Sequence, residues 1–271
     1  MEHSEELNSN QQNFEVRKRK YFSSLALKLK SALELHKSYD LLARNESGER
    51  EWGNVSEHCL VVAARTEALS KFIGLSKKTE DDLVLAAGMH DFYKKNQIQK
   101  TPSGIPLSMQ DYMDSEQEAA EALARAHVPQ NIIDYTGSFP DAIRTVQTIL
   151  TKGEHVSEEE IAALVFHYVD DYTQGSAWTK PAEINSQGRK VNDLNRRIEK
   201  AFSNPKYTSI NEEDKKYFDG KTSHEVQETV GESVEQFLAK RVTETKGIQI
   251  DSKDLPTIID EEIKKDIQAY R

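Results

Sequence analysis

Three short stretches of the sequence carry the side chains best suited to hold a divalent metal ion. They contain His58, the dipeptide His90-Asp91 and the aspartate pair Asp170-Asp171. Imidazole and carboxylate ligands without thiolate favour Mn, Fe, Ni, Co, Zn or Mg. Two histidines and two aspartates would leave positions open for a water and a substrate oxygen, and a metal held in this way lowers the pKa of water and polarises a phosphoryl group. The spacing therefore predicts one divalent metal ion that acts on a phosphate ester.

The predicted ligands lie on the apolar sides of their helices. His58 shares a helix face with Val62, and His90 shares one with Leu83. Taken singly, each histidine also fits a core histidine whose ring nitrogens are hydrogen-bonded. Asp91 is harder to accommodate, because an isolated buried carboxylate is so costly that it pairs, takes up a proton or binds a metal. The residues together favour the metal site, since chance would have to place each of them on the correct helix face.

Three further residues are candidates for catalysis beside the metal. Lys94 lies one helical turn past His90 and Arg65 follows His58 by seven residues, so each could place a cation beside a phosphate. Lys94 equally fits a solvated helix end, where a lysine complements the helix dipole. His167 could be a ligand, a substrate contact or a donor that orients an aspartate, and it also fits a surface histidine.

Length and composition narrow the class of protein. A chain of 271 residues can form one large domain, or a core domain with an appendage. The net charge of −10 and the pI near 5.4 argue against binding to duplex nucleic acid. The single cysteine, Cys59, excludes an internal disulfide and suits a reducing compartment. Because no window resembles a signal peptide or a run of about 20 apolar residues, we expect a cytoplasmic protein that does not enter a membrane.

Apolar residues recur at helical spacing along almost the whole chain, which predicts an all-α fold. Helices are expected at 14–42, 56–73, 80–93, 114–126, 129–135, 141–151, 157–172, 189–202, 211–218, 223–242 and 258–269. Two of them begin with a capping box, formed by Ser157 with Glu160 and by Thr222 with Glu225. The best strand signal, at 248–250, is weak.

The distribution of polar and apolar segments divides the chain into three regions. Residues 1–48 are expected to form an N-terminal helical extension, 49–178 the metal-binding core and 179–271 a C-terminal helical region, with both flanking regions packed on the core. Loops are expected at 44–53 and 96–113, the second over the mouth of the site. The helix at 223–242 could pack on its own core or pair with a second subunit to form a homodimer.

The pattern of His58, His90-Asp91 and Asp170 resembles the HD superfamily of metal-dependent phosphohydrolases. Three motifs carry this resemblance: Asn54-Val-Ser-Glu-His58, similar to the stretch of the first ligand, His90-Asp-Phe-Tyr-Lys94, similar to the His-Asp-x-x-Lys turn, and Tyr168-Val-Asp170, similar to the closing segment. The resemblance covers roughly residues 50–175. It implies an all-helical core around the metal and the hydrolysis of a phosphate mono- or diester, often of a nucleotide.

Two features of the site are left open by the residues themselves. A helical wheel does not decide between Asp170 and Asp171 as the last ligand, whereas the similarity of the closing segment favours Asp170. The binuclear branch of the superfamily has two further histidines in the interval before this segment, where the chain offers only His127, His155 and His167. We therefore expect a mononuclear site. Three glutamates are candidate general bases that also fit solvent-exposed positions: Glu57, Glu116 and Glu118.

Three classes of function follow. The first is a metal-dependent phosphohydrolase that acts on a small-molecule phosphoester, with Lys94 and Arg65 holding the phosphate. The second is a di-iron oxygenase of the kind that a minority of the superfamily represents, which needs more ligands than the sequence clearly provides. The third is a catalytically silent HD fold that senses a ligand or serves as a scaffold for a partner.

Overall fold

The computed structural model describes residues 2–38, 55–92, 94, 108–136, 141–205 and 208–270. Within these ranges the fold is all-α apart from one short antiparallel hairpin, as the sequence predicts. The elements are α1 (Glu2–Lys28), α2 (Lys30–Ser38), α3 (Val55–Ile73), α4 (Lys77–Met89), α6 (Met109–Arg125), α7 (Gln130–Thr136), α8 (Asp141–Thr151), η2 (Gly153–His155), α9 (Glu158–Tyr172), β1 (Glu183–Ile184), β2 (Lys190–Val191), α10 (Asp193–Phe202), α11 (Thr208–Asp214), α12 (Ser223–Lys246), η4 (Ser252–Asp254) and α13 (Leu255–Ala269). None of the described helices combines the length and apolar character needed to span a membrane.

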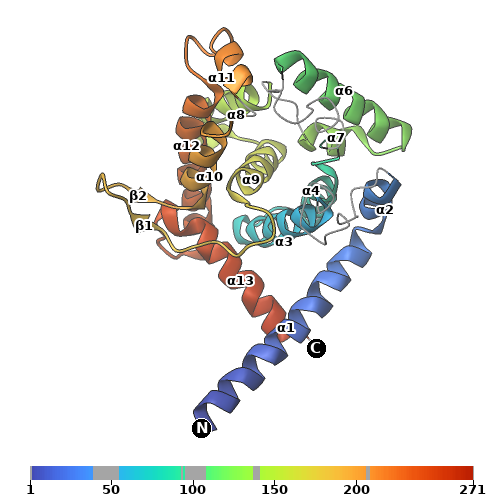
Figure 1. The fold of residues 1–271 in the computed structure, drawn as a ribbon, viewed down its shortest axis with the longest axis vertical. Helices are drawn as coiled ribbons and strands as arrows, with labels where there is room; N and C mark the ends of the chain where they lie inside the picture. Colours follow the sequence, from blue (N-terminus) through green and yellow to red (C-terminus); the bar gives the residue numbers. More distant parts are fainter. Residues whose placement is uncertain are drawn as a thin grey trace.

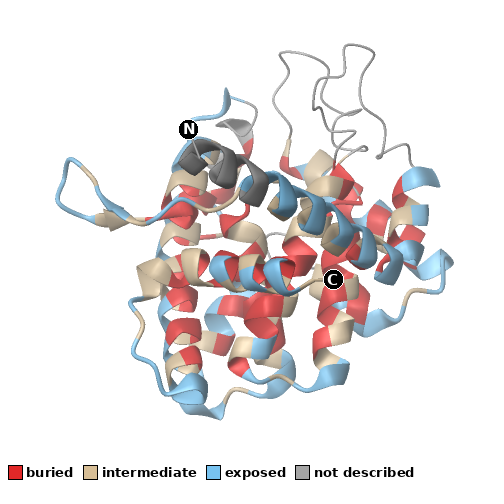
Figure 2. Ribbon diagram, turned by 90° about the horizontal axis from the view of Figure 1, so that it is seen from below, coloured by how far each residue is buried: buried red, intermediate tan, exposed pale blue. Residues whose placement is uncertain are grey.

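Helix α9 lies at the centre of the helical body (Figure 1). It contacts α3 and α4 on one side and α8, α10 and α12 on the other, so its residues are buried along most of its length. One continuous apolar cluster runs from Leu25 in α1 to Ile267 in α13, and buried positions occur along helices throughout the body (Figure 2). The N-terminal and C-terminal helices therefore share the core of the central ones.

Local sequence signals account for where several helices begin and end. Both predicted capping boxes are present: the side chain of Ser157 accepts from the Glu160 amide, and that of Thr222 accepts from the Glu225 amide. In each case the glutamate carboxylate accepts a hydrogen bond from the backbone amide of the Ser or Thr. Both bonds satisfy amides that would otherwise lack a partner at the start of a helix. Helix α12 ends at Gly247, whose φ of 68° lies in the left-handed region that glycine adopts at little cost.

The observed elements differ from the expected ones in several places. Among these, the start of the helix expected at 189–202 forms strand β2, and the helix expected at 80–93 ends at Met89. The N-terminal helix starts at Glu2 and is divided into α1 and α2 at Leu29, whose side chain packs against Gly88. Helix α6 begins at Met109, inside the expected loop, because the Ser108 side chain caps it. The weak strand signal at 248–250 corresponds to no strand, in agreement with the all-α expectation, and this segment has no neighbouring strand to pair with among the described residues. The expected loop at 44–53 lies outside the described residues, as does most of that at 96–113.

Asp214, the last residue of α11, predicts a pH dependence of stability. It is fully buried, and burial raises the pKa of its carboxyl group from 3.8 to about 6. The folded protein therefore keeps a proton that the unfolded chain releases near pH 4, and it loses stability as the pH rises from about 4 to 6. Replacing Asp214 with asparagine should remove this loss and raise the free energy of unfolding at about pH 7.5 by up to about 3 kcal/mol. Urea unfolding of both proteins at about pH 4.5 and pH 7.5 measures the difference, and an equal change in the two proteins would contradict the assignment.

Candidate metal centre

The ends of three helices bring the predicted metal ligands to one place. His58 lies in the first turn of α3, His90 directly follows α4, and Asp170 lies in the last turn of α9. Asp91 lies in the turn after α4, which is held by a hydrogen bond from the Phe92 amide to the Met89 carbonyl. Asp170 is distant in sequence from the other three candidate ligands. It lies near them only because α3 and α4 pack against α9.

Each of the two aspartates has an oxygen within 4 Å of both histidine Nε2 atoms, and the ligand atoms of His58, His90 and Asp91 all lie within 4.8 Å of one another. Asp170 Oδ1 is 3.3 Å from His58 Nε2 and 3.2 Å from His90 Nε2. Asp91 Oδ2 is 3.7 Å from His58 Nε2 and 3.9 Å from His90 Nε2. At a metal–ligand distance of about 2.1 Å, neighbouring ligand atoms lie about 3.0 Å apart in an octahedron and about 3.4 Å apart in a tetrahedron. The cluster thus needs only small adjustments to surround one divalent ion.

The histidine tautomers also fit a metal ion. His90 Nδ1 lies 2.8 Å from the Ala87 carbonyl oxygen, so Nδ1 carries the proton and donates it there. His90 Nε2 is then an acceptor, and it is buried without a well-aligned hydrogen bond in the described part of the chain. Its lone pair faces the Asp170 carboxylate, which is repulsive unless a proton or a cation lies between them. A backbone carbonyl on one ring nitrogen and a metal on the other is the usual arrangement of a histidine ligand.

The electrostatics of the cluster show how strongly it attracts positive charge. Burial on its own would raise the pKa of Asp170, but His90 and Arg197 hold it well below its ordinary value. Burial would lower the pKa of His90, yet Cys59 and, after it, the carboxylates of Asp170 and Asp91 raise this pKa well above 6.5. Protons on the imidazoles and a metal ion therefore serve the same purpose in this cluster, which is to balance the two carboxylates.

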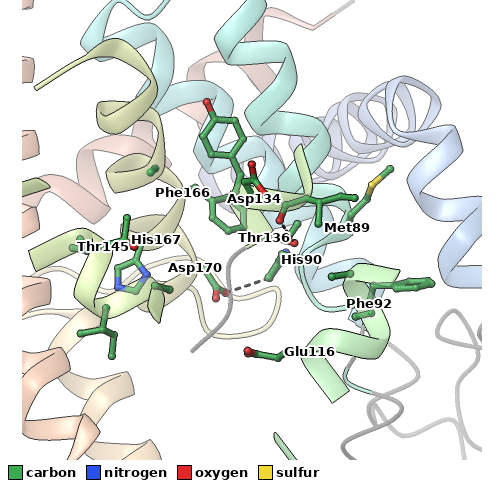
Figure 3. A pocket seen from close by; sticks show the side chains of 18 of the residues that line it. Met89, His90, Phe92, Glu116, Asp134, Thr136, Thr145, Phe166, His167 and Asp170 are labelled. Atoms are coloured by element: carbon green, nitrogen blue, oxygen red, sulfur yellow. Dashed lines mark hydrogen bonds and ion pairs between the residues drawn. The ribbon is translucent and has the colours of Figure 1, made fainter. Parts of the chain in front are cut away.

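The structure distinguishes the two neighbouring aspartates that the sequence leaves open. Asp170 points at His90 (Figure 3), whereas Asp171 Oδ2 lies 3.1 Å from His167 Nε2 on the same helix. Burial would lower the pKa of His167, but the Asp171 carboxylate raises it above 6.5. The geometry thus places Asp170 beside the two histidines of the cluster and Asp171 beside His167.

A cavity of about 440 Å³ adjoins the ligand cluster. His90, His167 and Asp170 line it on one side, as Figure 3 shows. Its other walls come from α6, α7 and α8 and combine apolar residues such as Ile143 with polar ones such as Asp134. Of the candidate general bases, Glu116 is buried and lines this cavity, whereas Glu57 and Glu118 are not among the lining residues. The cavity has room for the organic part of a small molecule.

The role predicted for Arg65 has to be corrected. Arg65 is only 1% exposed and forms a bidentate ion pair with Asp260 of α13, with both oxygens 2.8 Å from the guanidinium. Its remaining donors reach the Thr173 hydroxyl at 3.0 Å and the Ala177 carbonyl at 2.9 Å. Because it is buried and four of its five N–H donors are already used, Arg65 cannot hold a substrate phosphate. Arg65 lies seven residues after His58 and therefore on the same face of α3. At that position, however, α3 packs against α13 and not against the ligand cluster.

Two cations do lie beside the ligand cluster. Lys94 Nζ is 3.3 Å from Asp91 Oδ1, in line with its predicted position. Arg197 of α10 lies with its guanidinium 3.6 Å from Asp170 Oδ1 and was not singled out in the sequence. The only sequence signal for it is the pair Arg196-Arg197 in an amphipathic helix, and nothing in that pair indicates which arginine faces the site.

Comparisons of the chain with models of protein families, with curated proteins and with solved structures found no match. The class of the protein therefore rests on its own geometry. It is an all-α protein in which His58, His90 and Asp91, at the ends of α3 and α4, form a group that could hold a metal ion, with Asp170 of α9 beside both histidines.

Proposed function

We propose that this protein is a metal-dependent phosphohydrolase of the HD superfamily that cleaves a small-molecule phosphoester. The observation that carries the proposal is the convergence of His58 Nε2, His90 Nε2 and one oxygen each of Asp91 and Asp170, within 3.2–3.9 Å across the histidine–aspartate pairs. Two imidazoles and two carboxylates suit a divalent ion such as Mn, Fe, Ni, Co, Zn or Mg. When bound, such an ion polarises a phosphoryl group and activates water.

The residues around the cluster have separate tasks in this proposal. Lys94 binds the phosphoryl oxygens and offsets the charge that develops on them. The adjoining cavity, about 440 Å³ in volume, takes up the organic group and keeps bulk water from it. His167, held by Asp171, supplies a proton to the departing oxygen through the ring nitrogen that does not contact Asp171. A nucleotide is one candidate substrate, and we place the reaction in the cytoplasm.

A metal-supplemented screen of phosphoesters tests this proposal. The purified protein is treated with a chelator and then reloaded with Mn²⁺, Zn²⁺ or Mg²⁺ in separate reactions. We expect hydrolysis of at least one nucleotide or aryl phosphate, its loss after chelation and its recovery with metal.

The Asp91→Ala variant is the control for contaminating phosphatases. Activity that is equal in the variant and the parent would show that the assigned cluster is not the site. Stoichiometric metal binding without turnover of any ester would instead favour a sensor or scaffold protein, and two bound ions with an absorbance band would favour a di-iron oxygenase.

A further inference from the structure

Two adjacent arginines of α10 have different surroundings. Arg196 lies 2.7 Å from Asp193 and 3.0 Å from Glu183, so it forms ion pairs away from the ligand cluster. Arg197 NH1 donates a hydrogen bond to the Thr173 carbonyl at 2.8 Å and lies 3.6 Å from Asp170 Oδ1. Its side chain is 31% exposed, so the guanidinium is held at the edge of the cluster and is accessible from solvent.

The position of Arg197 is unfavourable for a site that binds only a cation. A guanidinium this close to a ligand carboxylate competes with the metal for the carboxylate and repels the ion. Lys94 has the same relation to Asp91, with 3.3 Å between Nζ and Oδ1. Each ligand carboxylate therefore has a fixed cation beside it. Such an arrangement becomes favourable when an anion binds next to the metal and contacts both cations.

The charges of these groups indicate which anion fits. With neutral imidazoles, the carboxylates of Asp91 and Asp170 cancel the charge of one divalent ion. Lys94 and Arg197 then leave two positive charges at the site. A phosphate monoester carries between about one and a half and two negative charges at neutral pH, because its second pKa is about 6, whereas a diester carries one.

We propose that Arg197 and Lys94 together bind the phosphoryl group, and that their two charges select a phosphate monoester over a diester. The identity of the substrate rests on the proposed function. The binding of a phosphoryl group by the two cations can be measured without turnover. It also gives α10, which lies outside the segment that resembles the HD superfamily, a part in the site. Glu116 and Asp134 line the cavity away from the two cations, so a second anionic group on the substrate would meet acidic residues there.

Variants at the two arginines test the inference. We would compare Arg197→Gln, Arg197→Lys and the matched control Arg196→Gln with the parent. Mn²⁺ alone is first titrated into each protein by calorimetry, and inorganic phosphate is then titrated into the Mn²⁺-loaded protein at about pH 8. Arg197→Gln should bind phosphate about 10- to 100-fold more weakly, which is the usual effect of losing a hydrogen bond to a charged group. It should bind Mn²⁺ at least as tightly as the parent, because a repulsive charge is gone.

The other two variants separate charge from structure. Arg197→Lys keeps the charge and should recover most of the phosphate affinity, and Arg196→Gln should remain within about 2-fold of the parent. Rates on p-nitrophenyl phosphate and bis(p-nitrophenyl) phosphate then measure selectivity. We expect the parent to prefer the monoester and Arg197→Gln to lose at least about 10-fold of that preference.

Two results would overturn the inference. One is equal phosphate affinity in Arg197→Gln and Arg196→Gln. The other is a loss of Mn²⁺ binding in Arg197→Gln that parallels its loss of phosphate binding, since that would make Arg197 a structural cap of α9. If phosphate binding depends on Arg197 but the parent hydrolyses neither ester, the binding role stands and the proposed phosphohydrolase function fails.

Discussion

Replacing Asp170 with asparagine is expected to weaken binding of a divalent metal by more than about 100-fold. Asp170 Oδ1 is the atom nearest to both histidine Nε2 nitrogens, at 3.2 Å and 3.3 Å, and it provides one of the two negative charges of the cluster. Mutation of a group that only orients a ligand typically lowers metal affinity by about 10- to 100-fold. Loss of a charged ligand should therefore lower it more. Calorimetric titration of Mn²⁺ or Zn²⁺ into the chelator-treated protein measures the effect.

The neighbouring residue provides the control. Asp171→Asn removes a carboxylate of the same kind from the same helix turn, but it affects the pair with His167 and not the ligand cluster. Its metal affinity should stay within a few-fold of the parent, and any loss should appear in the rate of turnover. Equal losses of metal affinity in both variants would mean that general negative charge, and not ligation by Asp170, holds the ion.

Replacing Asp260 with alanine is expected to lower the free energy of unfolding by about 3–5 kcal/mol. The change leaves the Arg65 guanidinium buried without its carboxylate, and both residues are only 1% exposed. It also removes the acceptor of the Thr179 amide and hydroxyl, at 2.6 Å and 2.8 Å. Urea unfolding at neutral pH measures the loss. The double replacement Arg65→Met with Asp260→Leu should recover much of it, because apolar residues avoid the unpaired buried charge.

The adjacent Glu261 is a suitable control for this experiment. It is 55% exposed and pairs with Lys264 on the surface of α13, so Glu261→Gln should change stability by less than about 1 kcal/mol. A loss in Asp260→Ala no larger than that of the control would show that the Arg65 pair does not stabilise the fold. Metal affinity should also fall about 10-fold in Asp260→Ala, because Arg65 holds the segment whose Gly175 carbonyl lies 3.4 Å from His58 Nδ1.

The sequence predicted helices well where the signal for a helix lies within a few neighbouring residues. The capping boxes at Ser157 and Thr222 were found because both of their partners lie within four residues. The weak strand signal at 248–250 corresponds to no strand, since a strand exists only when a second segment supplies the hydrogen bonds, and none of the described segments does so. The single N-terminal helix was expected because apolar spacing continues through Leu29, and helical hydrogen bonds from Leu29 to Leu25 and from Leu33 to Leu29 do continue past the boundary between α1 and α2.

For the site, residue type and approximate spacing determined the candidate ligands, but not their partners. His58, His90 and Asp91 were identifiable because an imidazole or a carboxylate on the apolar face of a helix needs a compensating partner wherever the helix packs. A helical wheel could not separate Asp170 from Asp171. The two residues point about 100° apart, and each lies at the edge of the apolar stripe of the helix. The packing of α9 against α4 decides between them.

The amino-acid sequence by itself determined an all-α chain with a set of imidazoles and carboxylates at helix ends. Only the tertiary structure decided which cations accompany them. Arg65 and Asp260 are 195 residues apart in the sequence, and their pairing takes Arg65 away from the site. Arg197 reaches the site because α10 packs against α9. The physical reason is that a side chain's type and helix face are local properties, whereas its charged partner is set by contacts between segments that no local pattern connects.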